Sequence, residues 1–183
     1  MSMSNKSSKQ YTVIKLSDTV KTYPTFSKNT KGWINYDKDN LLPQRIIELN
    51  NESAINKAVI ENKVTYICGA GVDDSEYYGQ PNPNCDWDRL IESLAKDYVT
   101  FGGYCFQVIL NENGKTVSLF HTDFSKIRVG HVNEYGGYLN FYLSNDWKKT
   151  TGKYAPVEIT AYGAEEMTKG KPYLFYYKDY EPS

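Results

Sequence analysis

Cys105, His121 and Asp123 are the side chains whose types best suit nucleophilic catalysis. An imidazole beside a cysteine can generate the thiolate that attacks a substrate, and a carboxylate can orient the imidazole. Cys105, however, falls inside a predicted strand, Tyr104 to Leu110, with no helix N-terminus or basic neighbour to lower the pKa of its thiol. The sequence therefore favours a buried structural thiol and predicts no catalytic residues. A small cysteine hydrolase is kept as an alternative.

Metal and cofactor sites are the next kind of chemistry to consider. Zinc ligands usually include pairs about two to four residues apart. The residues that could bind zinc are spaced much more widely: Cys68, Cys85, Cys105 and His121. Gly69-Ala70-Gly71 lacks the third glycine and the following helix of a dinucleotide-binding loop. We therefore expect no metal and no cofactor.

The composition is close to that of an ordinary globular domain, with 40% hydrophobic and 23% charged residues. The formal net charge of −1 gives the chain no general attraction to nucleic acid or to an anionic membrane. No run approaches the roughly 18 apolar residues that a membrane helix needs. Three cysteines, an odd number without a preceding signal segment, favour a reducing cytoplasm over secretion.

Tyrosine is the residue type that departs most from average usage, with 17 copies in 183 residues. Its ring suits half-buried strands and contact surfaces, because the ring is apolar while the hydroxyl can stay hydrated. Exposed rings can also stack on sugars or on single-stranded bases. Packing within the core and between subunits is the favoured use. An aromatic-rich binding module for carbohydrate or single-stranded nucleic acid is the first alternative, ahead of the small cysteine hydrolase.

Charge is unevenly distributed along the chain. Residues 1–31 contain six lysines and only one acid, Asp18, whereas residues 73–97 contain seven acids against Arg89 and Lys96. Two solvated surfaces would explain this pattern. A second interpretation is contact between the lysine-rich segment of one copy and the acidic segment of a neighbour. We predict that residues 1–31 form a flexible basic N-terminal arm, with a possible short strand at Tyr11 to Leu16, and that residues 32–183 form the folded domain.

Three helices are predicted within residues 32–183. Pro43 suits the first turn of a short helix that ends before Asn50-Asn51. Ser53 can cap a second helix over about residues 54 to 68, with Ile55, Val59 and Tyr66 on one face and Gly69 at its end. Asp86 can cap a third helix, which stops at Gly102-Gly103.

Strands fill the second half of the sequence. Residues 104–110 and 116–121 alternate around an Asn113-Gly114 turn, because both turn residues tolerate positive φ. Further strands are predicted over residues 126–129, 138–143, 157–162 and 173–177. The fold class is therefore α+β, with about three helices packed on an antiparallel β-meander sheet.

The stretch Gly32 to Ser53, GWINYDKDNLLPQRIIELNNES, resembles the opening signature of tailed-bacteriophage portal proteins, especially those of Bacteroides phages and prophages. There a tryptophan, an aromatic turn, an asparagine and a proline precede a short helix and a serine-capped helix. The resemblance covers about residues 32 to 183. It extends through the glycine that ends each longer helix, through residues 121–130 with an Arg before a Gly, and through Asn145-Asp146-Trp147 and Tyr173 to Ser183. The signature positions in this chain are Trp33, Tyr36, Asn40, Pro43, Ser53, Gly69, Gly102 and Trp147.

This resemblance implies a structural, non-enzymatic protein of the virion, present in the host cytoplasm during assembly. Portal proteins form a homo-oligomeric ring at one capsid vertex, through which double-stranded DNA passes, and the ring docks capsid, terminase and head-to-tail connector proteins. Residues 32–183 would correspond to the portal wing, with the stem and clip absent. Contact between this portion and DNA is not expected, because binding phosphates requires clustered Lys and Arg. No membrane contact is implied.

Overall fold

A computed structural model describes residues 26–28, 32–72, 79–113, 115–130, 137–163, 167 and 171–179. The predicted strand Tyr11 to Leu16 and nearly all of the predicted arm lie outside these ranges. The same holds for residues 73–78 of the acidic segment.

The described residues form three α-helices: α1 (Leu42–Glu52), α2 (Ala54–Cys68) and α4 (Trp87–Phe101). Pro43 lies in the first turn of α1, as predicted, because a missing N–H costs nothing where no helical partner exists. The helix continues through Asn50-Asn51, where the sequence predicted its end, and stops only at Ser53. Asparagine is a poor but tolerated helix residue, so it does not break a helix that neighbouring residues support.

The ends of α2 and α4 lie where local capping signals placed them. The Ser53 hydroxyl accepts a hydrogen bond from the Asn56 N–H at 3.2 Å, and the Asp86 carboxylate accepts one from the Arg89 N–H at 2.8 Å. Gly69 and Gly102 follow the two helices with φ of 56° and 73°. Glycine adopts positive φ at a lower energetic cost than other residues, so both glycines end their helices with little strain.

Two sheets form. A short one pairs β1 (Phe26–Lys28) with β2 (Ile34–Tyr36). The large sheet has six strands in the order β4 (Thr116–His121), β3 (Gly103–Leu110), β8 (Pro172–Lys178), β7 (Val157–Ala161), β6 (Asn140–Leu143) and β5 (Ile127–Val129). Two short 3₁₀ helices, η2 (Phe124–Lys126) and η3 (Gly152–Tyr154), lie in the connections.

The α+β class is confirmed, and the sheet is mostly antiparallel, but it is not a simple meander. The last strand, β8, lies between β3 and β7, and it pairs with β7 in parallel. Sequence alternation predicts that a strand exists and which side is apolar, but not which distant strand becomes its neighbour. The meander was therefore wrong in its strand order.

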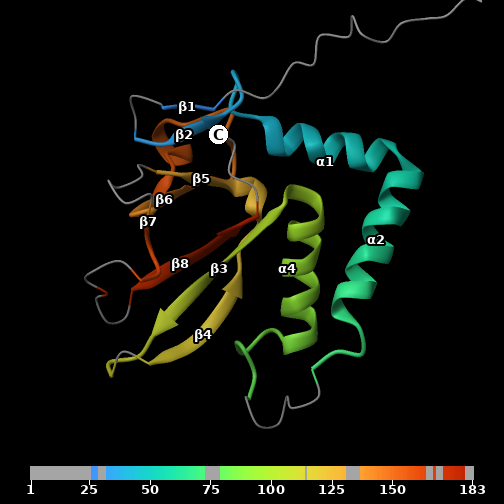
Figure 1. Ribbon diagram of the computed structural model, residues 1–183. Helices are drawn as coiled ribbons and strands as arrows, with labels where there is room; N and C mark the ends of the chain where they lie inside the picture. The colour runs from blue at the N-terminus through green and yellow to red at the C-terminus, as the bar shows by residue number, and fades with distance from the viewer. Residues whose placement is uncertain are drawn as a thin grey trace, which may run out of the picture.

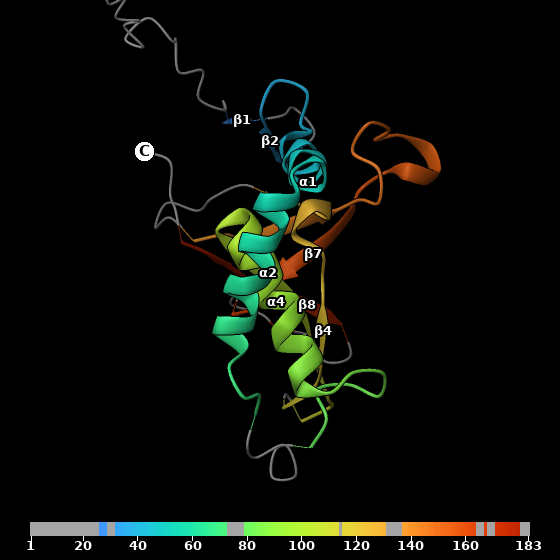
Figure 2. The same cartoon turned by 90° about the vertical axis from the view of Figure 1, so that its right-hand side faces the viewer.

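Helix α4 lies between the sheet and α2, so that the molecule is layered from sheet to α4 to α2 (Figures 1 and 2). The main core lies against β3, β5, β6, β7 and β8. Its buried members are Tyr36, Cys105, Phe124, Ile127, Val129, Phe141, Ile159, Ala161 and Leu174. A smaller core on β3 and β8 comprises Val108, Leu110 and Tyr173.

Candidate functional site

Four of the signature residues meet around one buried arginine, which the sequence analysis did not single out as a site residue. Arg128 is fully buried in β5. Its guanidinium carbon lies 4.8 Å from the centre of the Tyr36 ring and 4.6 Å from that of Trp147. A cation between two aromatic faces is attracted by both ring quadrupoles. Trp33 packs edge-on against Trp147 with ring centres 5.5 Å apart and so closes the outer side of the cluster.

All five N–H donors of the Arg128 guanidinium have an acceptor. Nε donates to Asn40 Oδ1 at 2.6 Å, and one terminal nitrogen donates to the carbonyls of Ser125 and Ile127 at 2.9 and 2.7 Å. The other terminal nitrogen donates to the Asn40 carbonyl at 2.6 Å and to Gln44 Oε1 at 3.3 Å. These five acceptors are neutral, and five is the full donor capacity of the group. We call Arg128 with Trp33, Tyr36, Asn40 and Trp147 the arginine hub.

Burial shifts the pKa values of two hub residues in opposite directions. It lowers the pKa of Arg128 to about 10, because the charged guanidinium loses water, although the nearby Tyr36 and Tyr176 partly oppose this. Burial raises the pKa of Tyr36 to about 12, because its phenolate would be poorly solvated. At neutral pH the hub therefore holds a cationic arginine and a neutral phenol.

Asn40 joins the hub to its own turn. Its side-chain oxygen accepts a hydrogen bond from the Tyr36 N–H at 3.0 Å as well as from Arg128. Its φ is 61°, a conformation that asparagine tolerates better than most residues. Arg45 on α1 forms ion pairs with Asp37 and Asp39 at the outer surface of the same turn. One asparagine thus supports both the turn and the buried cation.

The remaining signature residues serve helix ends rather than the hub. Pro43 is buried in the first turn of α1, Ser53 caps α2, and Gly69 and Gly102 follow α2 and α4. The signature therefore has two physical parts, one around Arg128 and one at helix termini. A lone arginine between Ile127 and Val129, in a strand of buried residues, was the signal that could have identified the hub.

Cys105, His121 and Asp123 each have a different partner. The Cys105 side chain is completely buried and its Sγ donates to the Thr122 carbonyl at 3.1 Å. Burial and the nearby Asp97 and Asp123 raise the pKa of this thiol well above its usual value. His121 Nε2 lies 2.8 Å from Asp97 Oδ2, and the Asp123 carboxylate caps η2 through Ser125. These contacts oppose thiolate formation, as the structural interpretation of Cys105 expects.

Asp97 is a buried residue that the sequence analysis grouped with surface acids. Its carboxylate also accepts a hydrogen bond from the Phe124 N–H at 3.1 Å, so it links α4 to both η2 and β4. Across the part of the chain that the structure describes, no group of three or more His, Cys, Asp or Glu side chains is arranged to hold a metal ion. Among the same residues, no helix has the length and apolarity to cross a membrane.

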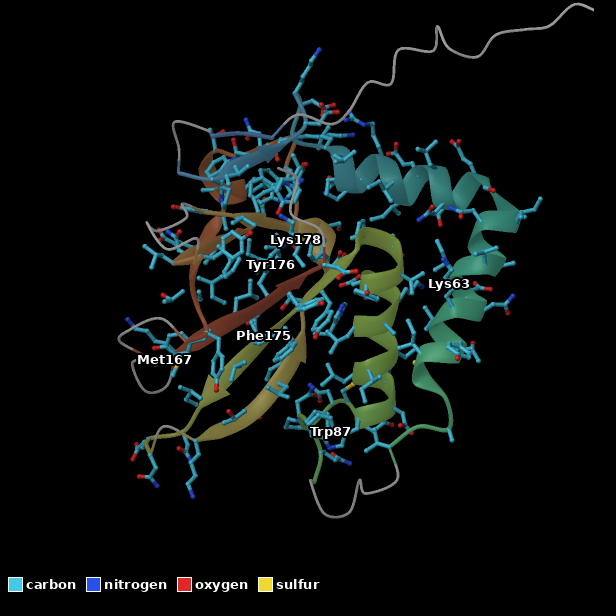
Figure 3. All side chains as sticks on the ribbon, viewed as in Figure 1. Lys63, Trp87, Met167, Phe175, Tyr176 and Lys178 are labelled. Atoms are coloured by element: carbon cyan, nitrogen blue, oxygen red, sulfur yellow. The ribbon has the colours of Figure 1, made fainter. Side chains whose placement is uncertain are left out.

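Four aromatic rings form a row across β3 and β8: Tyr104, Phe106, Phe175 and Tyr177. The Phe106 and Phe175 rings lie 4.8 Å apart at 15°, and those of Tyr104 and Tyr177 lie 5.2 Å apart at 25°. Figure 3 shows Phe175 and its neighbour Tyr176 on the central strand β8. The rings of the row stack on one another, and only Tyr177 is as much as 40% exposed. Their π faces thus serve packing between the two strands.

Helix α2 presents its predicted apolar face to solvent. Ile55 is 80% exposed and Tyr66 88%, with Val59 and Ile67 about half exposed, whereas Val64 on the opposite side is buried. The helix packs on its neighbours through Val64 and the half-buried Ile60, and not through the predicted face.

A groove of about 560 Å³ runs between α2 and the C-terminal end of α4. Val59, Lys63, Tyr66 and Ile67 form its α2 wall, and the other wall consists of Tyr98, Val99, Gly102 and Asp179. The Tyr98 hydroxyl donates to the Asp179 carboxylate at 3.0 Å, which raises the pKa of Tyr98. Figure 3 shows Lys63 on α2, separated from β8 by α4.

No protein-family model and no curated protein matches this chain. Solved structures that resemble it include two described as the neck of a gene transfer agent (GTA) particle and one described as the virion of the native GTA particle. The neck of the empty particle, with C6 symmetry, is 12% identical at a TM-score of 0.47, over 71% of this chain and 40% of that chain. The neck of the native particle, with C12 symmetry, is 13% identical at a TM-score of 0.47, over 70% and 39%.

The native virion structure is 12% identical at a TM-score of 0.48, over 71% of this chain and 39% of the matched chain. This chain thus spans about two fifths of the length of the chains it resembles.

Proposed function

We propose that this chain is a non-catalytic structural component of a tailed-phage or prophage particle, and that residues 32–183 form the wing-like part of a portal protein. In this role the domain is a rigid unit of a ring at the vertex where head meets tail. Its task is to hold a shape and to present surfaces to neighbours.

The observation that carries this proposal is the convergence of signature residues on Arg128. Trp33 and Trp147 come from two segments that lie far apart in the sequence, yet their rings lie 5.5 Å apart. Asn40 and Arg128 come from two further segments and are joined by two hydrogen bonds. Signature residues from separate short segments are expected to lie together in space if they specify one structural unit. The hub therefore supports the interpretation of these residues as a single family signature.

Two features favour this role over the alternatives. The Cys105 thiol is completely buried and donates a hydrogen bond to a carbonyl. This environment does not suit the nucleophile of a cysteine hydrolase. The aromatic row of β3 and β8 packs ring on ring, which leaves less π surface for a sugar or a base than a binding module requires. A fully bonded buried arginine, by contrast, suits a rigid scaffold.

The partners and location follow from the same proposal. The complete protein would form a homo-oligomeric ring in the virion, assembled in the host cytoplasm. It would meet capsid, terminase and head-to-tail connector proteins, with double-stranded DNA passing through the ring. Residues 1–31, with their six lysines, would reach the acidic segment of an adjacent subunit.

The test is electron microscopy of the complete gene product, combined with detection of the protein in purified particles. Closed rings in the micrographs, and the protein in particles at the few copies that one vertex holds, are the expected result. A product that stays monomeric and is missing from particles would refute the proposal. Deletion of residues 1–31 tests the arm separately, because unchanged ring assembly in that variant would remove the arm from the interface.

A further inference from the structure

Helix α2 has apolar residues on more sides than the described residues cover. Val64 is buried and Ile60 and Cys68 are half-buried, which accounts for the side that packs on α4. Ile55 and Tyr66, on the other side of the helix, are 80% and 88% exposed. A row of exposed apolar side chains is unfavourable in water and often marks a contact surface. The outer face of α2 therefore calls for a partner.

The spacing of the exposed residues suits packing against another helix. Ile55, Val59, Asn62 and Tyr66 follow one another at steps of four, three and four residues. Steps that alternate between four and three residues keep a seam on one side of a helix, as in helix pairs. We call these four residues the outer seam. An element that packs on the outer seam is best matched by a helix.

The outer seam continues into the groove between α2 and α4, because Val59 and Tyr66 belong to both. Each partner of a stable protein interface buries about 800 Å². Four side chains, of which even an aromatic one supplies about 150–250 Å², do not reach that area. The groove walls at Tyr98, Val99 and Ile67 extend the surface on the same side, so that seam and groove together suit an interface of ordinary size.

The charges on α2 and on the whole chain indicate the class of partner. The exposed charges of α2 have both signs, with Glu61 between Lys57 and Lys63. A polyanion such as nucleic acid would require a surface of one sign. The whole chain has 21 basic and 22 acidic residues, so two copies can approach without net repulsion. Both facts favour a second copy of this chain.

We propose that the outer seam and the adjoining groove bind a second copy of this chain through a helix of that copy. This inference rests on the proposed function in one respect, since it assigns a surface to the subunit contact that a ring requires.

The experiment is sedimentation velocity of the 183-residue chain across a wide range of concentrations, with an Ile55→Lys/Tyr66→Lys double variant. The wild-type chain is expected to associate reversibly, and the variant to show roughly a hundredfold higher dissociation constant. Circular dichroism and the urea midpoint should not change, because both side chains are mostly exposed in the single chain. The matched control is Leu139→Lys/Val157→Lys, which alters two exposed apolar residues elsewhere, 50% and 65% exposed.

Three results would overturn the inference: a wild-type chain that stays monomeric, a double variant that associates as strongly as wild type, or an equal loss in the control. Its failure is distinguishable from failure of the proposed function. If the complete gene product still forms rings with Ile55→Lys/Tyr66→Lys, the surface is wrong and the function stands. If α2 mediates association but the complete product forms no ring, the surface stands and the function is wrong.

Discussion

The arginine hub and the outer seam of α2 reverse the usual relation between residue type and burial. Arg128, the most polar side chain of its strand, is completely buried, whereas Ile55 and Tyr66 are almost fully exposed. Arginine is buried here because five acceptors and two aromatic faces replace its water. The outer face of α2 is exposed because no element of the described chain packs against it.

The comparison shows that a side chain's environment is decided by the partners that the fold supplies. In the hub, residues from three segments of the chain supply every bond that the buried group needs. At α2, the main neighbour, α4, covers only one side. We therefore expect substitutions in the hub to act on the stability of one chain, and substitutions on the outer seam to act on association between chains.

Loss of Arg128 should have the largest effect on stability. In Arg128→Met the five acceptor atoms around the guanidinium lose their donor inside the protein. This loss should lower the free energy of unfolding by about 3–5 kcal/mol. Arg128→Lys retains the charge but not the planar set of donors, so it should recover less than half of this. Urea denaturation measures both. Wild-type stability in Arg128→Met would show that the hub contributes nothing to the fold.

Asn40 should come next. Asn40→Ala removes an oxygen that accepts from Arg128 and from the Tyr36 backbone, and it places alanine at a φ of 61°. We expect a loss of about 2–3 kcal/mol. Asn40→Asp is the control, since it keeps the oxygen and tolerates the same φ. If the two variants unfold at the same urea concentration, the shared oxygen is not what Asn40 provides.

Tyr36 makes the hub sensitive to high pH. Because burial raises the pKa of Tyr36 from 10 to about 12, its stabilising effect is complete below pH 10 and is lost as the pH rises through 12. The maximum effect of such a shift is about 2–3 kcal/mol. Arg128, whose pKa is lowered, acts in the opposite direction over the same range.

The pH effect of Tyr36 is isolated by comparing Tyr36→Phe with wild type, because Arg128 titrates in both. Thermal melts between pH 9 and 11 should show a steeper alkaline loss in wild type than in the variant. Parallel curves would mean that the Tyr36 hydroxyl does not titrate with unfolding.

The smallest effect on the single chain is expected within α2, from a pair of valines. Val64→Ala should lower stability by about 1–2 kcal/mol, because Val64 is buried against α4. Val59→Ala should change it by less than about 0.5 kcal/mol, because Val59 is 44% exposed. Urea melts at low protein concentration make the comparison. A larger loss in Val59→Ala than in Val64→Ala would contradict the assignment of the two faces.

Local chemistry made much of this fold predictable. Ser53, Asp86 and Gly102 act on backbone groups within a few residues, so the helix limits could be derived from the sequence. The hairpin of residues 103–110 and 116–121 was equally predictable, since alternation and turn residues are adjacent in sequence. These elements need no information from elsewhere in the chain.

Contacts between distant segments were not predictable in the same way. The burial of Arg128 depends on Asn40 and Trp147, far away in sequence on either side, and nothing near residue 128 specifies them. The two apolar sides of α2 look equivalent in sequence, with Ile60 and Val64 on one and Ile55 and Val59 on the other. Only the position of α4 decides which side is covered.

The place of β8 has a consequence for how the chain is made. Among the described strands of the large sheet, β3 and β4 on one side are joined to β5, β6 and β7 on the other only through residues 172–178. During synthesis the two halves of the sheet therefore keep unpaired backbone groups on their inner edges until that segment leaves the ribosome. A nascent chain stalled before Pro172 would hold two incomplete sheets, and chaperones or early aggregation would act on it at that point.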